Sequence, residues 1–513
     1  MLLLIPALGA NAHVGSPDVF YEGKAGPYPL FVTVRVPQVI PGVAEIQVRS
    51  ESRDVRSIRV VPMRLAGPGS NLPPTPDLAA QSKDDPQFFT ASLWLMESGA
   101  LQVRVQADGT QGQGETSVPV PSSAQRTLPM RKSLAGLLLA LLLVLAIGAI
   151  FIVGAIVREG NLEGGEAPSD ARKRRARRAM AISAILVAAL LYLGRAWWSS
   201  DAANFQRRVD FFKPPATVLN LVNGHRLEIR VEHNDKADRR DLRTPAYLKL
   251  GDVIPDHGHL MHLFLLRVPD LDAMWHLHPE ADGEDAFAVV LPDMPAGRYQ
   301  IFADVVDPRG YPWTLVGTTD LPQISGRPLT GDDSMWSGSA LDASAASDST
   351  TAPLPGGGRI VWQRPPGELK AGMPFEFTFE VEDKNGRPAS DMQPYMGMAG
   401  HAEFVRSDLS VFAHVHPAGS VSMAALDLAQ AGMTGEASPA QSAMSMPMPV
   451  STSMNMPTGE SGPLPPEVRF PYGFPQAGEY RIYVQIKRAG RVETGSPSRT
   501  DPIMGREETR RAT

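Results

Sequence analysis

Residues 262–279, HLFLLRVPDLDAMWHLHP, recur in altered form as residues 401–417, HAEFVRSDLSVFAHVHP. Both stretches begin with a histidine, continue through an apolar segment and end in a His-x-His-Pro sequence. A third shared element follows each of them: GRYQI begins at Gly297 and GEYRI begins at Gly478. Three matching elements in one order indicate that the chain carries two copies of one domain.

Each copy has the pattern of β-strands between turns. Leu227, Ile229 and Val231 alternate with charged residues, and stretches rich in proline and glycine follow. Period-two alternation is typical of antiparallel sheets with one solvated face. A region near the start of the chain shows the same alternation around Val103 but lacks the His-x-His-Pro sequence. We therefore predict a mainly β protein with three immunoglobulin-like β-sandwich domains.

Composition shifts set the expected boundaries of these domains. Two regions rich in small and polar residues interrupt the β pattern, and low complexity of this kind is typical of linkers and surface loops. The predicted sandwiches span residues 13–122, 216–325 and 359–502, with a flexible linker at 326–358 and a methionine-rich insertion at about 430–466.

Two apolar runs lie between the first and second β regions. Residues 134–157 and 179–198 are each long enough to cross a bilayer as a helix. Residues 158–178 between them carry a cluster of arginines and a lysine, and positively charged loops stay in the cytoplasm. We predict a two-pass protein of the bacterial inner membrane, with its N- and C-terminal domains on the periplasmic side. The lipid bilayer is its first expected partner.

The first residues resemble an export signal. Residues 1–12 are apolar and end in the small-x-small pattern of Ala10 and Ala12, so we predict a signal peptide whose usual basic beginning is missing. An uncleaved apolar tail is the alternative. Cleavage would make His13 the new N-terminus, and a terminal amine with an imidazole can chelate copper.

Composition excludes several classes of function. A net charge of −6 offers no electrostatic footprint for nucleic acid, which we exclude as a partner. The chain has no cysteine, so it forms neither disulfides nor thiolate metal sites. A metal would therefore be held by imidazole, carboxylate or thioether groups.

The duplicated histidines form the strongest candidate site. Residues i and i+2 of a strand share a face, so the two histidines of each His-x-His-Pro sequence point the same way. The upstream histidine is one hairpin away and falls opposite them. Three imidazoles on one sheet face suit Cu(II) or Zn(II). The predicted metal ligands are His262, His276, His278, His401, His414 and His416, with His257 and His259 as further candidates. The alternative is that these are packing or surface histidines.

Methionines distinguish copper from zinc among the possible metals. A thioether is a soft ligand that selects Cu(I), and alternating methionines in a polar loop do not serve core packing. The candidate thioether ligands are Met396, Met398, Met444, Met446, Met448, Met454 and Met456. The alternative for the insertion is low-complexity drift in a tolerated loop.

The two copies resemble YtkA-like and FixH-like extracytoplasmic β-sandwich domains, and more loosely the CopC-type periplasmic copper-resistance sandwiches. The resemblance is carried by His401, by the sequence FAHVHP that ends at Pro417, and by the strand that begins at Gly478. It implies a fold more firmly than an activity, because many such domains have no assigned role.

These features predict a membrane-anchored extracytoplasmic metal-binding protein that sequesters copper, or zinc as the alternative, or delivers it to an envelope protein. Two other functions remain open. The sandwiches could form an assembly module that binds partner proteins without metal, or a copper-dependent redox enzyme. We rank the enzyme last and expect no catalytic activity, because the sequence shows no paired carboxylates, nucleophile–base motif or phosphate-binding loop.

Overall fold

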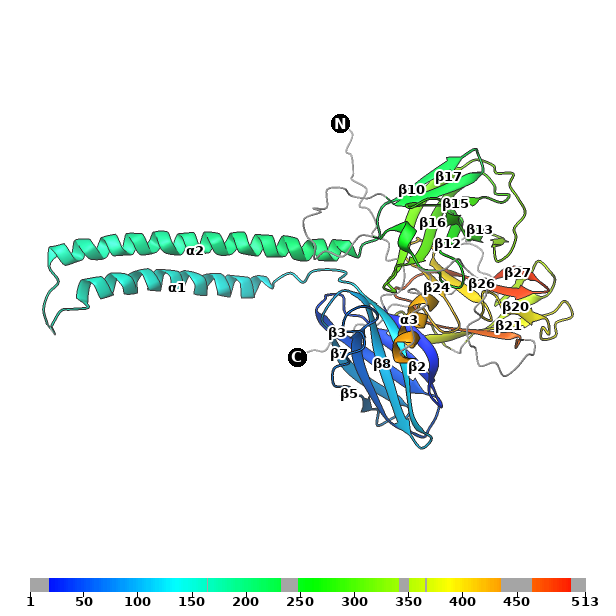
Figure 1. The fold of residues 1–513 in the computed structure, drawn as a ribbon, viewed down its shortest axis with the longest axis horizontal. Helices are drawn as coiled ribbons and strands as arrows, with labels where there is room; N and C mark the ends of the chain where they lie inside the picture. Colours follow the sequence, from blue (N-terminus) through cyan, green and yellow to red (C-terminus); the bar gives the residue numbers. More distant parts are fainter. Residues whose placement is uncertain are drawn as a thin grey trace. The chain divides into compact units, whose positions relative to one another are not determined.

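The computed structural model describes residues 18–163, 165–231, 248–340, 350–364, 367–434 and 464–499, and we discuss only these. The fold is mainly β, with several antiparallel sheets and two long helices (Figure 1). The chain divides into two compact units: residues 124–213 contain the two long helices, and residues 1–123 with 214–513 contain the sheets.

The first β region contains a five-stranded and a four-stranded sheet. Its five-stranded sheet has the order β1 (Val19–Ala25), β2 (Tyr28–Arg35), β3 (Gly42–Ser50), β7 (Phe88–Leu95) and β6 (Ala80–Gln81). The other has the order β5 (Asp77–Leu78), β4 (Val55–Arg64), β8 (Gly99–Gly109) and β9 (Gly112–Ser122). In β3, Ile46 and Val48 are buried while Glu45 and Arg49 are exposed, so the alternation read from the sequence has the expected physical cause.

The second β region has the same composition of sheets. One sheet has the order β10 (Thr217–Val222), β11 (Arg226–Val231), β15 (Ala286–Val290) and β14 (Glu280–Ala281). The other has the order β17 (Pro312–Leu321), β16 (Gly297–Val306), β12 (His262–Val268), β13 (Ala273–Leu277) and β18 (Ser334–Ser337). A short 3-10 helix, η1 (Leu250–Asp252), precedes β12.

The third β region repeats this arrangement. One sheet has the order β19 (Thr351–Pro353), β20 (Arg359–Gln363), β21 (Phe375–Glu382) and β25 (Glu467–Tyr472). The other has the order β22 (Met392–Gln393), β26 (Tyr480–Arg488), β23 (His401–Arg406) and β24 (Phe412–Val415), with β27 (Arg491–Arg499) also paired to β26. Phe377 and Phe379 of the first sheet share a buried core with Phe404 and Ile482 of the second, so the two sheets pack face to face.

The second and third β regions are alike beyond their sequence motifs. Tyr299 donates a hydrogen bond to the carbonyl oxygen of Pro295 at 2.7 Å, and Tyr480 donates one to Gln476 at 2.9 Å, each four residues back. The glycines two residues before these tyrosines both have positive φ, +159° at Gly297 and +139° at Gly478. The duplication therefore extends to local backbone geometry.

The two regions pack together through the sheets that carry the histidines. Phe264 and Phe302 of the second region share an apolar cluster with Val405, Phe412 and Tyr483 of the third. The rings of Phe302 and Phe412 stack with their centroids 4.2 Å apart. This apolar cluster holds β12 and β13 against β23 and β24, and the histidines lie beside it.

The predicted flexible linker, residues 326–358, is wrong in part. Ser334–Ser337 forms β18, which pairs with β13, and Thr351–Pro353 forms β19, which pairs with β20. Trp336 packs against Tyr483 with ring centroids 5.3 Å apart, which fixes this segment between the two regions. Serine and aspartate dominate the composition of this segment, so a prediction from composition missed the apolar contact that Trp336 makes.

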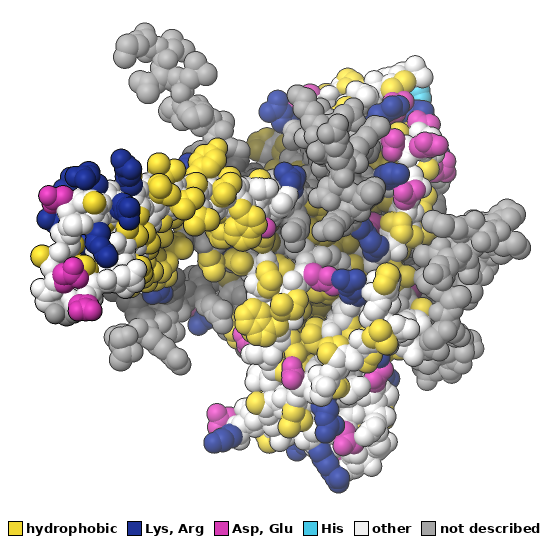
Figure 2. All heavy atoms as spheres, turned by 60° about the vertical axis from the view of Figure 1, so that its left-hand side comes forward, with side chains coloured by type: hydrophobic (Ala, Val, Ile, Leu, Met, Phe, Trp, Pro, Cys, Tyr) yellow, Lys and Arg dark blue, Asp and Glu magenta, His cyan; other side chains and the backbone are white. Residues whose placement is uncertain are grey.

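The other unit consists of α1 (Lys132–Glu159) and α2 (Asp170–Phe211), both long and apolar enough to cross a membrane. The two predicted spans lie inside them. The predicted basic loop is shorter than expected because α2 begins at Asp170, so the arginine cluster is helical. A Cβ atom on Gly154 would lie 2.6 Å from Met180, so this glycine permits close packing. Figure 2 shows hydrophobic side chains along these helices and basic side chains gathered at one end.

Candidate metal centre

Two β-hairpins position the histidines as the spacing predicted. In the second β region Phe264 of β12 faces His276 of β13, and in the third Glu403 of β23 faces His414 of β24. Continuing each register by two residues places His262 opposite His278 and His401 opposite His416. The ring centroids of each of these two pairs are 5.1 Å apart.

The packing of the two regions brings these hairpins together. Eight histidines form one contiguous group of rings, which we call the histidine cluster: His257, His259, His262, His276, His278, His401, His414 and His416. Across the interface His414 lies 5.5 Å from His262 and 5.8 Å from His276, measured between ring centroids. The two predicted sites are therefore neighbours in one cluster between the two regions.

The first of two tight groups within the cluster consists of His262, His276 and His278, as predicted. One ring nitrogen from each of these residues lies within 4.8 Å of those from the other two. His262 Nδ1 and His276 Nε2 are 3.2 Å apart. We call this set the first histidine group.

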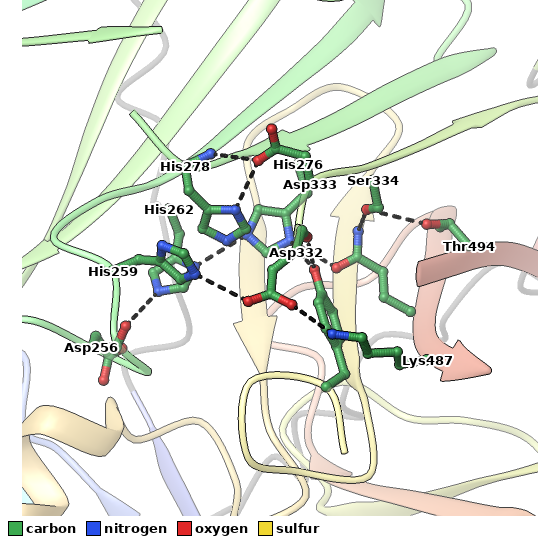
Figure 3. A network of polar contacts seen from close by, with 12 residues as sticks. Asp256, His259, His262, His276, His278, Asp332, Asp333, Ser334, Lys487 and Thr494 are labelled. Carbon is green, nitrogen blue, oxygen red and sulfur yellow. Dashed lines mark hydrogen bonds and ion pairs between the residues drawn. The ribbon is translucent and has the colours of Figure 1, made fainter. Parts of the chain in front are cut away.

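The remaining nitrogens of the first histidine group are held by oxygen atoms (Figure 3). His262 Nε2 lies 3.0 Å from the backbone oxygen of Asp256, and His276 Nδ1 lies 2.8 Å from Gln485 Oε1. Gln485 Nε2 donates to Ser334, which fixes the orientation of the amide. Both imidazoles must therefore donate through these outer nitrogens and keep lone pairs on the inner ones.

His278 completes this pattern. Its Nδ1 lies 3.0 Å from Asp333 Oδ1, and its Nε2 is buried without a hydrogen-bond partner among the described residues. An imidazole anchored to a carboxylate or carbonyl through one nitrogen presents the other in a fixed direction, as metal-binding histidines do.

The facing lone pairs of His262 and His276 require a cation or a proton between them. Two acceptors 3.2 Å apart in a buried site repel each other unless a positive charge bridges them. Nitrogens bound to one tetrahedral metal at about 2.0–2.1 Å lie about 3.3 Å apart. The observed spacing fits a shared metal ion.

The second histidine group consists of His257, His401 and His416, whose nitrogens also lie within 4.8 Å of one another. His257 Nε2 and His416 Nε2 are 3.1 Å apart, and His416 Nδ1 lies 3.1 Å from the backbone oxygen of Val421. His401 is buried, and neither of its ring nitrogens has a hydrogen-bond partner in the described part of the chain.

Membership of the second histidine group differs from the prediction, which had His414 with His401 and His416. His257 takes this place, and it comes from the second β region rather than the third. It occupies the tip of a turn, with a φ of +53°, from which its ring crosses the interface. The sequence signal was present, since PDHGHLMH before β12 aligns with PYMGMAGH before β23.

His414 lies between the two groups, with its ring centroid 5.5 Å from that of His262 and 5.3 Å from that of His401. His259 lies beside the first group. His414 Nδ1 is 3.5 Å from Asp304 Oδ2, and its ring centroid is 4.6 Å from that of His416. His259 stacks on His278 with centroids 3.9 Å apart, and its Nε2 lies 3.4 Å from Asp332. Neither residue belongs to one of the two tight groups.

Burial determines the charge state of the cluster. Removal from water lowers the pKa of His276, His278, His401 and His414 well below the usual value, and it lowers the pKa of His416 to about 3. Neutral imidazole is the form that binds metal ions. The site therefore presents its ligands without first having to release protons at neutral pH.

The buried Glu403 and the partly buried Asp304, two carboxyl groups beside His414, were missed by sequence reasoning. Burial raises the pKa of Asp304 to about 7, and burial together with the charge of Asp304 raises the pKa of Glu403 well above its usual value. Both oxygens of Glu403 lack a hydrogen-bond partner within the described ranges. A glutamate in a period-two strand is normally predicted to be solvated, so its sequence gave no sign of this position.

Among the other candidate ligands, the structure describes Met396 and Met398, which belong to the turn before β23. The remaining candidates lie outside the described residues: His13, Met444, Met446, Met448, Met454 and Met456. The predicted signal peptide, residues 1–12, lies outside them as well.

Comparisons with known proteins give no function. No curated protein matches the sequence. An engineered protein of known structure matches with 18% identity over 18% of this chain and 20% of its own, at a TM-score of 0.15. This chain therefore spans a fifth of that protein's length.

Two other solved structures are similar over more of the chain. A tetra-tandem repeat from the extending region of a large adhesion protein has 8% identity, covering 91% of this chain and 72% of its own, with a TM-score of 0.16. An ICAM-5 D1–D4 ectodomain fragment has 9% identity, covering 93% and 77%, with a TM-score of 0.14. Residues 357–498, which contain the second histidine copy, match a family described as a domain of unknown function (DUF8832).

Proposed function

We propose that this protein is a membrane-anchored metal-binding protein that holds copper in the histidine cluster, either to sequester it or to deliver it to an envelope protein. The sheets of the described residues would form three immunoglobulin-like sandwiches on the periplasmic side of a bacterial inner membrane. The helical unit would anchor them in the bilayer, with the basic segment 172–178 in the cytoplasm.

One observation carries the proposal. His262 and His276 present lone pairs to each other at 3.2 Å, and each is held in that orientation by an oxygen atom on its far side. A purely structural pair would gain more from donating one N–H to the other ring. A cation removes the repulsion and satisfies both acceptors at once.

The chemistry of the site favours copper among the possible metals. Imidazole nitrogens bind copper and zinc alike, whereas thioethers select Cu(I). Met396 and Met398 lie in the turn that leads into His401. The burial of the cluster favours retention and transfer of a metal over catalysis, because the ligands face protein instead of open solvent.

The test is metal binding by the full chain purified in detergent. Cu(I), Cu(II) and Zn(II) are titrated against chelators of known affinity for the wild type and for a His276→Ala, His416→Ala double variant. His225→Ala is the matched control, because the side chain of this histidine is exposed, lies outside the histidine cluster and contacts the backbone oxygen of Asn223. We expect the double variant to lose affinity by about a hundredfold or more, since even outer-shell changes cost about tenfold to a hundredfold.

One result of this titration would contradict the proposed function. If wild type and double variant bind copper and zinc equally, with circular dichroism showing both folded, the metal-binding function is wrong. The cluster would then be a packing feature, and an assembly module that binds envelope proteins would be the better account.

A further inference from the structure

The turns that precede β12 and β23 are structural copies with different tips. His257 has a φ of +53° and Met396 a φ of +49°, and the glycines that follow them have φ of +86° and +82°. Each turn is closed by reciprocal backbone hydrogen bonds, between Asp256 and His259 and between Tyr395 and Met398. His257 and Met396 therefore occupy equivalent positions.

The tip of the first turn supplies a ligand to the opposite β region. The His257 ring lies 4.6 Å from His416 and 5.3 Å from His401, measured between centroids. The tip of the first turn therefore crosses the interface to the third β region.

The second turn crosses the interface in the reverse direction. The hydroxyl of Tyr395, the residue before Met396, lies 3.3 Å from His276 Nδ1 and donates to the backbone oxygen of Asp332 at 2.8 Å. In return, Asp256, the residue before His257, accepts a hydrogen bond from Ala424 N at 2.7 Å. Each turn therefore contacts the other β region.

We propose that the thioether of Met396 is a ligand of the first histidine group, equivalent to the imidazole of His257 in the second. This inference rests on the proposed function. Both side chains are partly buried, as ligands at an interface are. The first group would then offer three nitrogens and one sulfur and select Cu(I), whereas the second would offer three nitrogens and accept Cu(II) or Zn(II).

The test compares three variants of the full chain in detergent. Met396→Leu keeps the size of the side chain and removes the sulfur, and Met396→His gives the second turn the tip of the first. Met373→Leu is the matched control, because Met373 is an exposed methionine of the same β region. The measurements are Cu(I) and Cu(II) affinity by chelator competition, and X-ray absorption of the Cu(I) form at one equivalent.

We expect Met396→Leu to weaken Cu(I) binding by about tenfold or more and to remove a copper–sulfur contribution from the absorption spectrum. Met396→His should shift the preference from Cu(I) to Cu(II), and Met373→Leu should behave as wild type. Wild-type behaviour of Met396→Leu, or equal losses in Met396→Leu and Met373→Leu, overturns the inference.

The two proposals fail in different ways. If the His276→Ala, His416→Ala variant binds copper as wild type does, the proposed function fails and this inference fails with it. If that variant loses copper while Met396→Leu retains full Cu(I) affinity, only the role of Met396 is wrong.

Discussion

The two histidine groups differ in how firmly their imidazoles are held. Each histidine of the first group is anchored through its outer nitrogen, to Asp256, Gln485 or Asp333. In the second group His416 is anchored to Val421, whereas His401 has no hydrogen-bond partner among the described residues. A preorganised group loses less conformational entropy on binding, so it should hold its metal more tightly.

The largest expected effect comes from removing ligands of one group at a time. A His276→Ala, His278→Ala variant should lose the tightest copper equivalent, with its affinity falling by about a hundredfold or more. A His401→Ala, His416→Ala variant should lose only the weaker equivalent. Stepwise chelator competition distinguishes them, and equal losses in the two variants would show that the groups are not different in strength.

The anchor of His278 offers the next test. Asp333→Ala removes the carboxylate that holds Nδ1, and we expect the affinity of the tight equivalent to fall by about tenfold to a hundredfold. Asp332→Ala is the control, because Asp332 contacts His259 and Lys487, which lie outside the first group. If Asp332→Ala lowers the affinity of the tight equivalent by as much, the effect comes from the negative charge of this segment and not from the hydrogen bond between Asp333 and His278.

Bound metal should also stabilise the contact between the two β regions. His257 belongs to one region and binds with His401 and His416 of the other, so an ion in the second group joins them. A ligand at a hundred times its Kd adds about 2.7 kcal/mol of stability. Thermal unfolding with and without copper should show a gain that shrinks in His257→Ala and is unchanged in His225→Ala. A full gain in His257→Ala would contradict the cross-interface ligand.

The smallest expected effect is at His414. This residue belongs to neither tight group, so His414→Ala should retain both copper equivalents with affinities within a few-fold of wild type. Metal content per chain after dialysis measures this directly. If His414→Ala loses one copper equivalent, His414 is a metal ligand, as the sequence predicted.

Local patterns predicted much of the fold. Alternation of side chains anticipated strands such as β3, and the two-residue spacing within His-x-His-Pro anticipated the shared face of each hairpin. Hydropathy sufficed for α1 and α2. The earlier start of α2 follows from the arginines and alanines of its first turns, which are good helix formers.

The remaining features depend on packing between β regions, which local patterns do not encode. His257 joins the second group only because the two regions meet face to face, and a single sequence contains no such contact. For the same reason Glu403 was not expected to be buried. Trp336 inside a serine-rich stretch gave too weak a signal for β18.

The central claim is that the histidine cluster between the two duplicated β regions binds metal in each of its two groups. Anomalous X-ray diffraction at the copper absorption edge, from crystals of the copper-loaded full chain, tests it most directly. We predict one peak beside His262, His276 and His278 and a second beside His257, His401 and His416. Copper-loaded crystals without any anomalous peak in the histidine cluster would contradict the account.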